Sequence, residues 1–337
     1  MGLLNLKDVL VHAYHNKYAV GSFNVINMEF LEAIVEAAER MNSPVILSIA
    51  EVHFQYVNIE NITPAIREVA RRANVPVVVH LDHGTSFEAI IRALRAGFTS
   101  VMYDGSVLGF EENVAKTREI VRICHAVGVT VEAELGHVGG AEGGGDDGSG
   151  SQKSPEEFYT KVDEAVEFVK QTGVDCLAVA VGTAHGLYKG TPKLDFERLS
   201  KLNDALRIPL VLHGGTGLSI EAFREAIKLG VAKINFYTGM SVAACDSLRE
   251  SFKKNPDTIS FPDLMKDARA SVQKTVEENM EIFMSTGICT TPNELCHYCT
   301  GCSLMTDTNI ASRAPSEEDL INRVTQATVE ALRRFGY

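Results

Sequence analysis

The segment Val75-Pro76-Val77-Val78-Val79-His80-Leu81-Asp82-His83-Gly84 is an apolar, mostly β-branched run that ends in polar, chemically active side chains and a glycine. The same arrangement recurs at 132–136 (EAELG), 182–186 (GTAHG) and 212–215 (LHGG). In a barrel of parallel strands the carboxyl ends of all strands meet at one rim. Histidines and carboxylates at four strand ends therefore predict a shared site at that rim, because packing alone explains such a pattern poorly.

Eight alternations of apolar and amphipathic segments surround these runs. The apolar segments are rich in Val, Ile and Leu without strict alternation, as buried parallel strands are, and we expect strands at Tyr18–Val25, Pro44–Ala50, Val75–Leu81, Thr99–Tyr103, Val129–Leu135, Asp175–Val181, Pro209–Leu212 and Ala232–Tyr237. We expect helices at Met28–Met41, Ile62–Ala73, Ser86–Ala96, Phe110–Val127, Pro155–Thr172, Asp195–Ala205, Ser219–Leu229 and Met240–Lys254. The pattern predicts an α/β fold, a TIM (β/α)8 barrel with extra C-terminal helices. A doubly wound sheet is the alternative, but it explains chemistry at so many strand ends less well.

The chain is expected to divide into a catalytic barrel, residues 1–284, and a C-terminal extension, residues 285–337. The extension follows a long helix at Phe261–Met284 and ends in a helix at Ser316–Phe335. Ser86 and Ser154 are expected to cap helices, and Pro155 suits a first helical position.

Composition limits the class of protein. The 337 residues carry a formal net charge of -12, which argues against nucleic acid as a partner but not against a small phosphorylated ligand. There is no apolar run of membrane-spanning length and no signal-peptide pattern near the N-terminus. Seven cysteines, an odd number, suit a reducing compartment. We therefore expect a cytoplasmic protein with no membrane partner.

Three histidines at different strand ends, His83, His185 and His213, predict a divalent-metal site, with Zn²⁺ as the expected ion. A single buried histidine is more often structural, but the joint pattern is hard to explain as packing. Asp82 stands beside the first ligand and can move a proton of a bound hydroxyl. His80 and His137 are interpreted as supporting or structural residues.

Further polar groups are expected at the same rim. Asp104 and Glu134 can hold a second ion or orient the ligand histidines, although each is equally well a solvated rim acid. The stretches 213–217 (HGGTG) and 235–239 (NFYTG) follow the seventh and eighth strands, where TIM barrels commonly bind phosphate. An ordinary turn is the alternative for either stretch alone.

Two segments stand outside the repeat. Gly139–Gly150 contains seven glycines and is either a disordered surface loop or a mobile lid over the rim. The tail holds Cys289, Cys296, Cys299 and Cys302, whose spacing can bind Zn²⁺ or an iron–sulfur cluster, with free or redox-active thiols as an equal alternative.

These motifs resemble those of the class II, metal-dependent ketose-bisphosphate aldolases, the group of fructose- and tagatose-bisphosphate aldolases. The resemblance runs from about Leu6 to Met284, and its most specific segments are 81–84 (LDHG), 131–136 (VEAELG), 182–188 (GTAHGLY), 212–215 (LHGG) and 233–235 (KIN). It implies a lyase of carbohydrate metabolism, such as glycolysis. The expected reaction is reversible cleavage of a phosphorylated ketose, fructose 1,6-bisphosphate-like or a related ketose 1-phosphate. The expected products are dihydroxyacetone phosphate and an aldehyde, formed through a zinc-bound enediolate.

The resemblance also implies residue roles. His83, His185 and His213 would hold the catalytic zinc, and Asp104 and Glu134 a second divalent or monovalent cation. Asp82 would move the proton of the hydroxyl next to the cleaved bond, and Glu142 would serve the carbon-bound proton of the donor from a mobile loop. Residues that would bind substrate are Asn24, Gly186, Gly214, Gly215, Thr216, Asn235, Tyr237 and Thr238. Family members are usually dimers or tetramers, and we expect a homodimer or homotetramer here.

Three departures from the family pattern concern the acceptor end of the substrate. Phe236-Tyr237 replaces an aliphatic residue followed by a small or acidic one, and Ala50 replaces a Ser or Thr. The stretch after Met284 supplies no cation for a distal phosphate, and Arg313 could replace it only in a rearranged tail. The aldehyde product is therefore expected to differ from glyceraldehyde 3-phosphate.

Two other functions remain open from sequence. A metal-dependent sugar-phosphate isomerase or epimerase would use the same metal on the same barrel without breaking a carbon–carbon bond. A non-catalytic redox or metal sensor would rely on the cysteine cluster instead. The Glu142 loop and the two phosphate motifs favour the aldolase.

Overall fold

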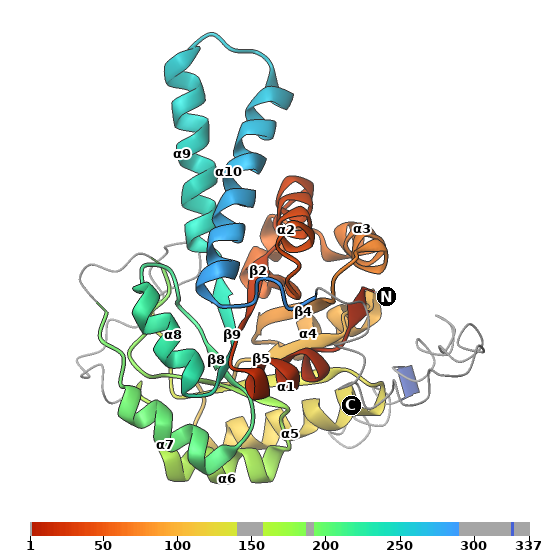
Figure 1. The fold of residues 1–337 in the computed structure, drawn as a ribbon. Coiled ribbons are helices and arrows are strands. Elements are labelled where there is room, and N and C mark those ends of the chain that lie inside the picture. Colours follow the sequence, from red (N-terminus) through yellow and green to blue (C-terminus); the bar gives the residue numbers. More distant parts are fainter. Residues whose placement is uncertain (1, 140–157, 187–191, 290–324, 327–337) are drawn as a thin grey trace.

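Eight parallel strands close into a barrel in the computed structural model, which describes residues 2–139, 158–186, 192–289 and 325–326 (Figure 1). The barrel strands are β2 (Val20–Asn24), β3 (Val45–Ala50), β4 (Val77–Gly84), β5 (Ser100–Tyr103), β6 (Thr130–Leu135), β7 (Cys176–Val179), β8 (Leu210–Leu212) and β9 (Val231–Phe236). Neighbours in sequence are neighbours in the sheet, and the pairings of β2 with β9 and of β4 with β5 complete the circle. The predicted TIM barrel is confirmed.

Helices surround this barrel, and all of those described except Leu6–Asn16 and Glu51–Gln55 correspond to helices expected from the sequence. They are α1 (Leu6–Asn16), α2 (Met28–Met41), α3 (Ile59–Arg72), α4 (Phe87–Ala96), α5 (Phe110–Ala126), α6 (Val162–Thr172), α7 (Phe196–Leu206), α8 (Ile220–Lys228), α9 (Thr238–Lys254) and α10 (Phe261–Ile282), with a short 3₁₀ helix η1 at Glu51–Gln55. Side chains cap several of them; the Ser86 hydroxyl accepts from the amide of Ala89 at 3.0 Å, as expected for the start of α4.

Two predicted helix starts are wrong: α3 begins at Ile59 and not at Ile62, and the larger error is at the start of α6. The helix expected from Pro155 begins only at Val162, and the described residues 158–161 are not α-helical. Thr160 explains the difference, since its hydroxyl donates to the carbonyl of Leu135 and accepts from the amide of Ala180. Thr160 is thereby tied to the ends of β6 and β7. Ser154 and Pro155 lie outside the described residues.

The strand pleat divides the barrel interior into layers. Alternate residues of one strand point inward, so Val78, His80 and Asp82 of β4 lie one above the other, and all are fully buried. The lowest layer is apolar and packs on α1, whose Leu6, Val9 and Leu10 close that end of the barrel. Polar residues begin one layer higher, and the active rim lies at the opposite, carboxyl end.

A short first strand, β1 (Leu3–Leu4), was not expected. It pairs in parallel with the start of β4, where Leu3 faces Val77. Two residues are too few to produce a recognisable apolar pattern, so the sequence alone gives no signal for this element.

Helices α9 and α10 run side by side and extend beyond the barrel (Figure 1). The barrel end of α10 packs through Phe283, whose ring lies 5.2 Å from Phe223 and 6.5 Å from Phe23. Residues 285–289 stay on the barrel, since the amides of Gly287 and Cys289 donate to the carbonyls of Met41 and Asn42. The domain division at residue 284 stays a prediction, because most of the extension, including most of the helix expected at 316–335, lies outside the described residues. Among the described helices, none is long and apolar enough to cross a membrane.

Phe283→Ala should destabilise the protein by about 3–5 kcal/mol, because it leaves a cavity among buried aromatic rings. Tyr56→Ala is the control: Tyr56 is also aromatic but is 77% exposed, so its loss should change stability by no more than about 0.5 kcal/mol. Chemical unfolding with saturating zinc measures both. Equal unfolding midpoints for the two variants would contradict the assigned packing.

Candidate active site

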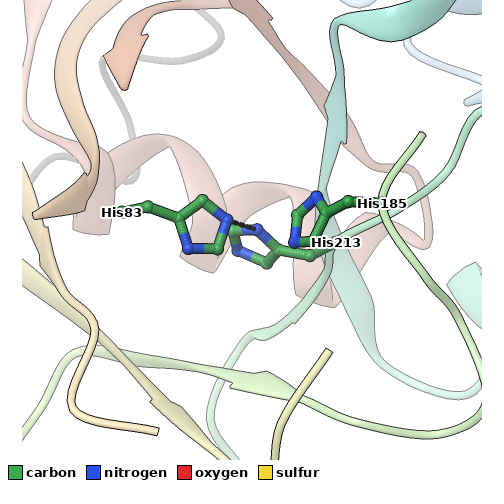
Figure 2. Close-up of side chains that lie close together, drawn as sticks. All are labelled: His83, His185 and His213. Atoms are coloured by element: carbon green, nitrogen blue, oxygen red, sulfur yellow. Dashed lines mark hydrogen bonds between the residues drawn. The ribbon is translucent and has the colours of Figure 1, made fainter. Parts of the chain in front are cut away.

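Three histidines meet at the carboxyl rim of the barrel. His83 is the next-to-last residue of β4, His185 lies in the loop after β7, and His213 directly follows β8. One ring nitrogen from each lies within 4.8 Å of the others, and the three side chains point toward one another (Figure 2). The predicted convergence of the three residues is confirmed.

Carboxylates fix the orientation of two of these rings. Asp104 Oδ2 lies 2.8 Å from His83 Nδ1, and Glu132 Oε1 lies 3.0 Å from His213 Nε2. A carboxylate accepts, so each of these nitrogens carries a hydrogen, and the opposite nitrogen of each ring presents its lone pair. Asp104 therefore contacts His83 in the way expected of an orienting carboxylate, and its role at a metal stays a prediction.

The two lone-pair nitrogens, His83 Nε2 and His213 Nδ1, face each other at 2.8 Å. Two lone pairs at this distance repel unless a proton or a metal ion lies between them. With His185 completing the set, the three neutral imidazoles match the donor set of an open zinc site. The residues present therefore fit a divalent metal. Burial also lowers the pKa of His185 well below its usual value, which favours the neutral, metal-binding form.

Asp82 faces the same rim although it immediately precedes His83. Successive side chains of a regular strand point to opposite faces, but β4 shifts register after Leu81 and His83 has a positive φ of 42°. This irregularity lets Asp82 and His83 reach the same rim. Asn24 donates to Asp82 Oδ2 at 3.1 Å and Asn235 to Oδ1 at 2.7 Å. Burial would raise the pKa of Asp82, but positive charge on His83, carried as a proton only while no metal is bound, and the charge of Lys233 outweigh it and hold the pKa far below its usual value.

The pKa of Glu134 is shifted in the opposite direction to that of Asp82. It is 1% exposed, and burial, followed by the charge of Asp104, raises its pKa to about 8. Its Oε1 accepts from the amide of Val138 at 3.1 Å. Glu134, Asp104 and His83 form a second group able to hold an ion. A divalent cation there would favour the ionised carboxylate.

The two candidate phosphate segments lie together. The amide of Gly239, in the first turn of α9, donates to the Thr216 hydroxyl at 3.2 Å. Gly214 has a φ of 68°, and a Cβ there would lie 2.4 Å from the carbonyl oxygen of Ala184. Only glycine fits this position, which brings the β8 loop against the loop of His185. The first amides of a helix have no acceptor within the helix, so the start of α9 is suited to an anion.

The glycine-rich segment begins beside the histidines. The amide of His185 donates to the carbonyl of Gly139 at 2.8 Å. Glu142 lies outside the described residues. Its proposed role therefore stays a prediction from the sequence.

The cysteine cluster receives no support from the described residues. Cys289 packs against the core, and burial raises the pKa of its thiol to about 12, which is typical of a structural thiol. Cys296, Cys299 and Cys302 lie outside the described residues, so the second metal or cluster stays a prediction.

Three buried residues at this end of the barrel were not predicted from the sequence to take part in the site. Glu132 and Lys233 form an ion pair at 2.8 Å below His213, and neither was assigned a role. His53 is 4% exposed and lies 4.6 Å from the ring of Tyr237, centroid to centroid. Their spacing in the sequence could have revealed them. Glu132 and Lys233 stand two residues before Glu134 and Asn235, so on a strand they share the same inward face. His80 is buried with Nδ1 2.8 Å from Ser100, and His137 contacts Ser106, so both lie outside the three-histidine cluster as expected.

Comparisons with known proteins agree with this geometry. The sequence profile described as fructose-bisphosphate aldolase class-II matches residues 4–288. A fructose-bisphosphate aldolase of Geobacillus stearothermophilus is 44% identical over 290 residues, which cover 85% of this chain and 99% of the relative. A probable fructose-bisphosphate aldolase of Bacillus subtilis (strain 168) is 41% identical over 288 residues, with the same coverage of 85% and 99%.

Solved structures give the same result. The YdjI aldolase of Escherichia coli K12 superposes with a TM-score of 0.75 at 36% identity, covering 85% of this chain and 99% of that one. A putative fructose-1,6-bisphosphate aldolase of Coccidioides immitis gives a TM-score of 0.76 at 32% identity, covering 85% and 98%.

Metal-free protein should lose stability between pH 6.5 and 8 because of Glu134. Its pKa, about 8 when folded, is above the usual 4.5, so the folded state binds more protons and the stabilisation, complete below 4.5, is lost as pH rises through 8. The loss over this window is on the order of 1–2 kcal/mol. The lowered pKa values of His80 and His213 make stability rise with pH, but mainly below pH 6.5.

Glu134→Gln should flatten this part of the stability profile, measured by chemical unfolding in a chelator. Glu197→Gln, at a side chain that is 80% exposed, is the control and should keep the wild-type slope. An unchanged slope in Glu134→Gln would show that the carboxyl is ionised across the whole window.

Proposed function

This chain belongs to the class II fructose-bisphosphate aldolase family and catalyses aldol cleavage of a phosphorylated ketose, and we propose that its ketone product is dihydroxyacetone phosphate. The observation that carries the proposal is the convergence of the nitrogens of His83, His185 and His213 beside a buried, doubly hydrogen-bonded Asp82. Family membership favours the aldolase over the isomerase and sensor alternatives.

His83, His185 and His213 are proposed to hold the zinc on which this family generally depends. When bound, zinc supplies Lewis acidity to the ketose carbonyl and its neighbouring hydroxyl. Asp104 and Glu134 are proposed to hold a second divalent or monovalent cation, for which they offer oxygen ligands beside His83.

Asp82 is proposed to take the proton of the hydroxyl next to the bond that breaks. A low pKa keeps its carboxylate ionised and ready to accept, and the amides of Asn24 and Asn235 fix both of its oxygens. The hydroxyl oxygen becomes the aldehyde oxygen as the carbon–carbon bond breaks, and the bonding electron pair stays with the donor half. Glu142 is proposed to protonate that donor carbon, which completes dihydroxyacetone phosphate.

The donor phosphate is proposed to lie between the β8 and β9 loops, at Gly214, Gly215, Thr216 and Thr238, with Gly186 closing one side. The start of α9, whose first amides have no acceptor within the helix, and the Thr216 hydroxyl, which accepts from the amide of Gly239, support this placement. Asn235 and Tyr237 are proposed to contact substrate hydroxyls.

The acceptor end is proposed to differ from that of enzymes specific for fructose 1,6-bisphosphate. Tyr237 stands where an acid is common in the family, and its ring meets His53. A ketose 1-phosphate without a distal phosphate suits this aromatic wall as well as a bisphosphate does.

Assembly and location are further proposals. A homodimer or homotetramer would cover the apolar side chains exposed near the outer ends of α9 and α10, namely Phe252, Ile259 and Phe261. An odd number of cysteines suits the cytoplasm.

His185→Ala should abolish tight zinc binding and lower kcat/KM by at least about 10³-fold, because it removes one of three protein ligands. Zinc content after dialysis and the cleavage rate measure the two effects. His15→Ala, at an exposed histidine on α1, is the control and should change neither. Full activity in His185→Ala would refute the site.

A panel of ketose phosphates should identify the substrate. We expect the zinc-loaded enzyme to release dihydroxyacetone phosphate from at least one of fructose 1,6-bisphosphate, tagatose 1,6-bisphosphate and fructose 1-phosphate. Dihydroxyacetone phosphate alone should exchange one carbon-bound hydrogen in D₂O, which tests the donor half without any aldehyde. Failure of both release and exchange would overturn the aldolase assignment of the site.

A further inference from the structure

A buried ionic group lies directly beneath the three histidines. Glu132 of β6, Lys233 of β9 and His80 of β4 point into the barrel, and none of the three is exposed. Lys233 Nζ lies 3.0 Å from Glu132 Oε1 and 2.8 Å from Oε2, and His80 Nε2 lies 3.6 Å from Oε2. The strands β6 and β9 are not neighbours in the sheet, so this ion pair crosses the barrel.

Glu132 has a second contact that stability alone does not require. Its Oε1 also lies 3.0 Å from Nε2 of His213, the candidate metal ligand above it. This contact gives His213 the tautomer with hydrogen on Nε2 and leaves the Nδ1 lone pair facing His83. Both ligand-side nitrogens of the pair are thus set by acids: His83 by Asp104 at the rim, and His213 by Glu132 from below.

We propose that Glu132 and Lys233 are positioning residues of the metal centre: Lys233 fixes and neutralises Glu132, and Glu132 holds the His213 ring in its ligating tautomer and orientation. The inference rests on the proposed role of His213 as a zinc ligand. It predicts that metal affinity, and not only stability, depends on a hydrogen-bond acceptor at position 132.

The energetics of buried charge favour this role over simple stabilisation. Removing two charges from water is expensive, and apolar residues of similar volume often stabilise a core equally well or better. The layer of the barrel below this ion pair is apolar. Apolar side chains at positions 132 and 233 would therefore be expected to stabilise the core as well as the ion pair does. Glu132 has a more specific role as the hydrogen-bond acceptor of His213. Mutating such a partner of a ligand histidine typically lowers metal affinity by about 10- to 100-fold.

Two charge-neutral double variants separate the acceptor from the charge. Glu132→Gln with Lys233→Met keeps an amide oxygen for His213 Nε2, whereas Glu132→Leu with Lys233→Met has none. Both variants remove the ion pair together, so neither leaves an unpaired buried charge. Thermal unfolding and near-ultraviolet circular dichroism of the metal-free proteins establish that each variant is folded.

The readout is the zinc dissociation constant of the metal-stripped full chain, measured by competition with a chromogenic chelator. The Gln variant should bind zinc within about threefold of wild type, and the Leu variant about 10- to 100-fold more weakly. The visible spectrum of Co²⁺-loaded protein should be wild-type in the Gln variant and altered in the Leu variant, because it reports the ligand geometry.

Equal zinc affinity in the two variants would overturn the proposal, whether both match wild type or both are weakened. If the Leu variant does not fold, Glu132→Asn with Lys233→Met replaces it, because this amide is one methylene too short for His213. His125→Ala is the outer control: it removes a histidine–carboxylate contact of 2.8 Å to Asp175, away from the cluster, and should leave zinc affinity unchanged. His185→Ala tests the zinc site itself, through the loss of bound zinc. The double variants test only the positioning role of Glu132 and Lys233, so a failure of one proposal can be told from a failure of the other.

Discussion

The two-residue period of the strand pleat, enforced by barrel closure, is the constraint on which this site depends. On a buried strand the residue that reaches the rim and the residue two positions earlier share one inward face. Asp82 therefore stands above His80, Glu134 above Glu132, and Asn235 above Lys233. The upper residues form the candidate reactive layer, and the lower residues form the polar layer that supports it. Beneath both, an apolar layer packed on α1 closes the barrel.

Charge is distributed unevenly over these two layers. Asp82, Asp104 and Glu132 are held ionised by hydrogen bonds and positive neighbours, whereas burial raises the pKa of Glu134 to about 8. The same burial lowers the pKa of His185 and of His213. A set of neutral imidazoles beside ionised acids is what a divalent cation requires. The electrostatics, like the facing nitrogens of His83 and His213, therefore point to a metal at the rim.

The match to the aldolase family covers the barrel and ends at residue 288. Within it, the site that we propose keeps the donor half of the family pattern, from the histidines to the loops after β8 and β9. The proposed differences lie at the other end of the substrate, where Tyr237 meets His53. A fixed donor site with a variable acceptor wall is physically reasonable, because the metal and phosphate contacts are the same for every ketose 1-phosphate while the aldehyde differs.

The sequence by itself determined the barrel, the extent of α2 and the three histidines, because these depend on local periodicity and on the meeting of strand ends at one rim. It also indicated that Asp82 and His83 could share a site. Only the tertiary structure decided the partners of these residues. Glu132 and Lys233 are 101 positions apart and meet across a closed barrel. Thr160 hydrogen-bonds to the ends of two strands, and α6 therefore begins later in the sequence than predicted. Such contacts depend on closure and register, which no local pattern encodes.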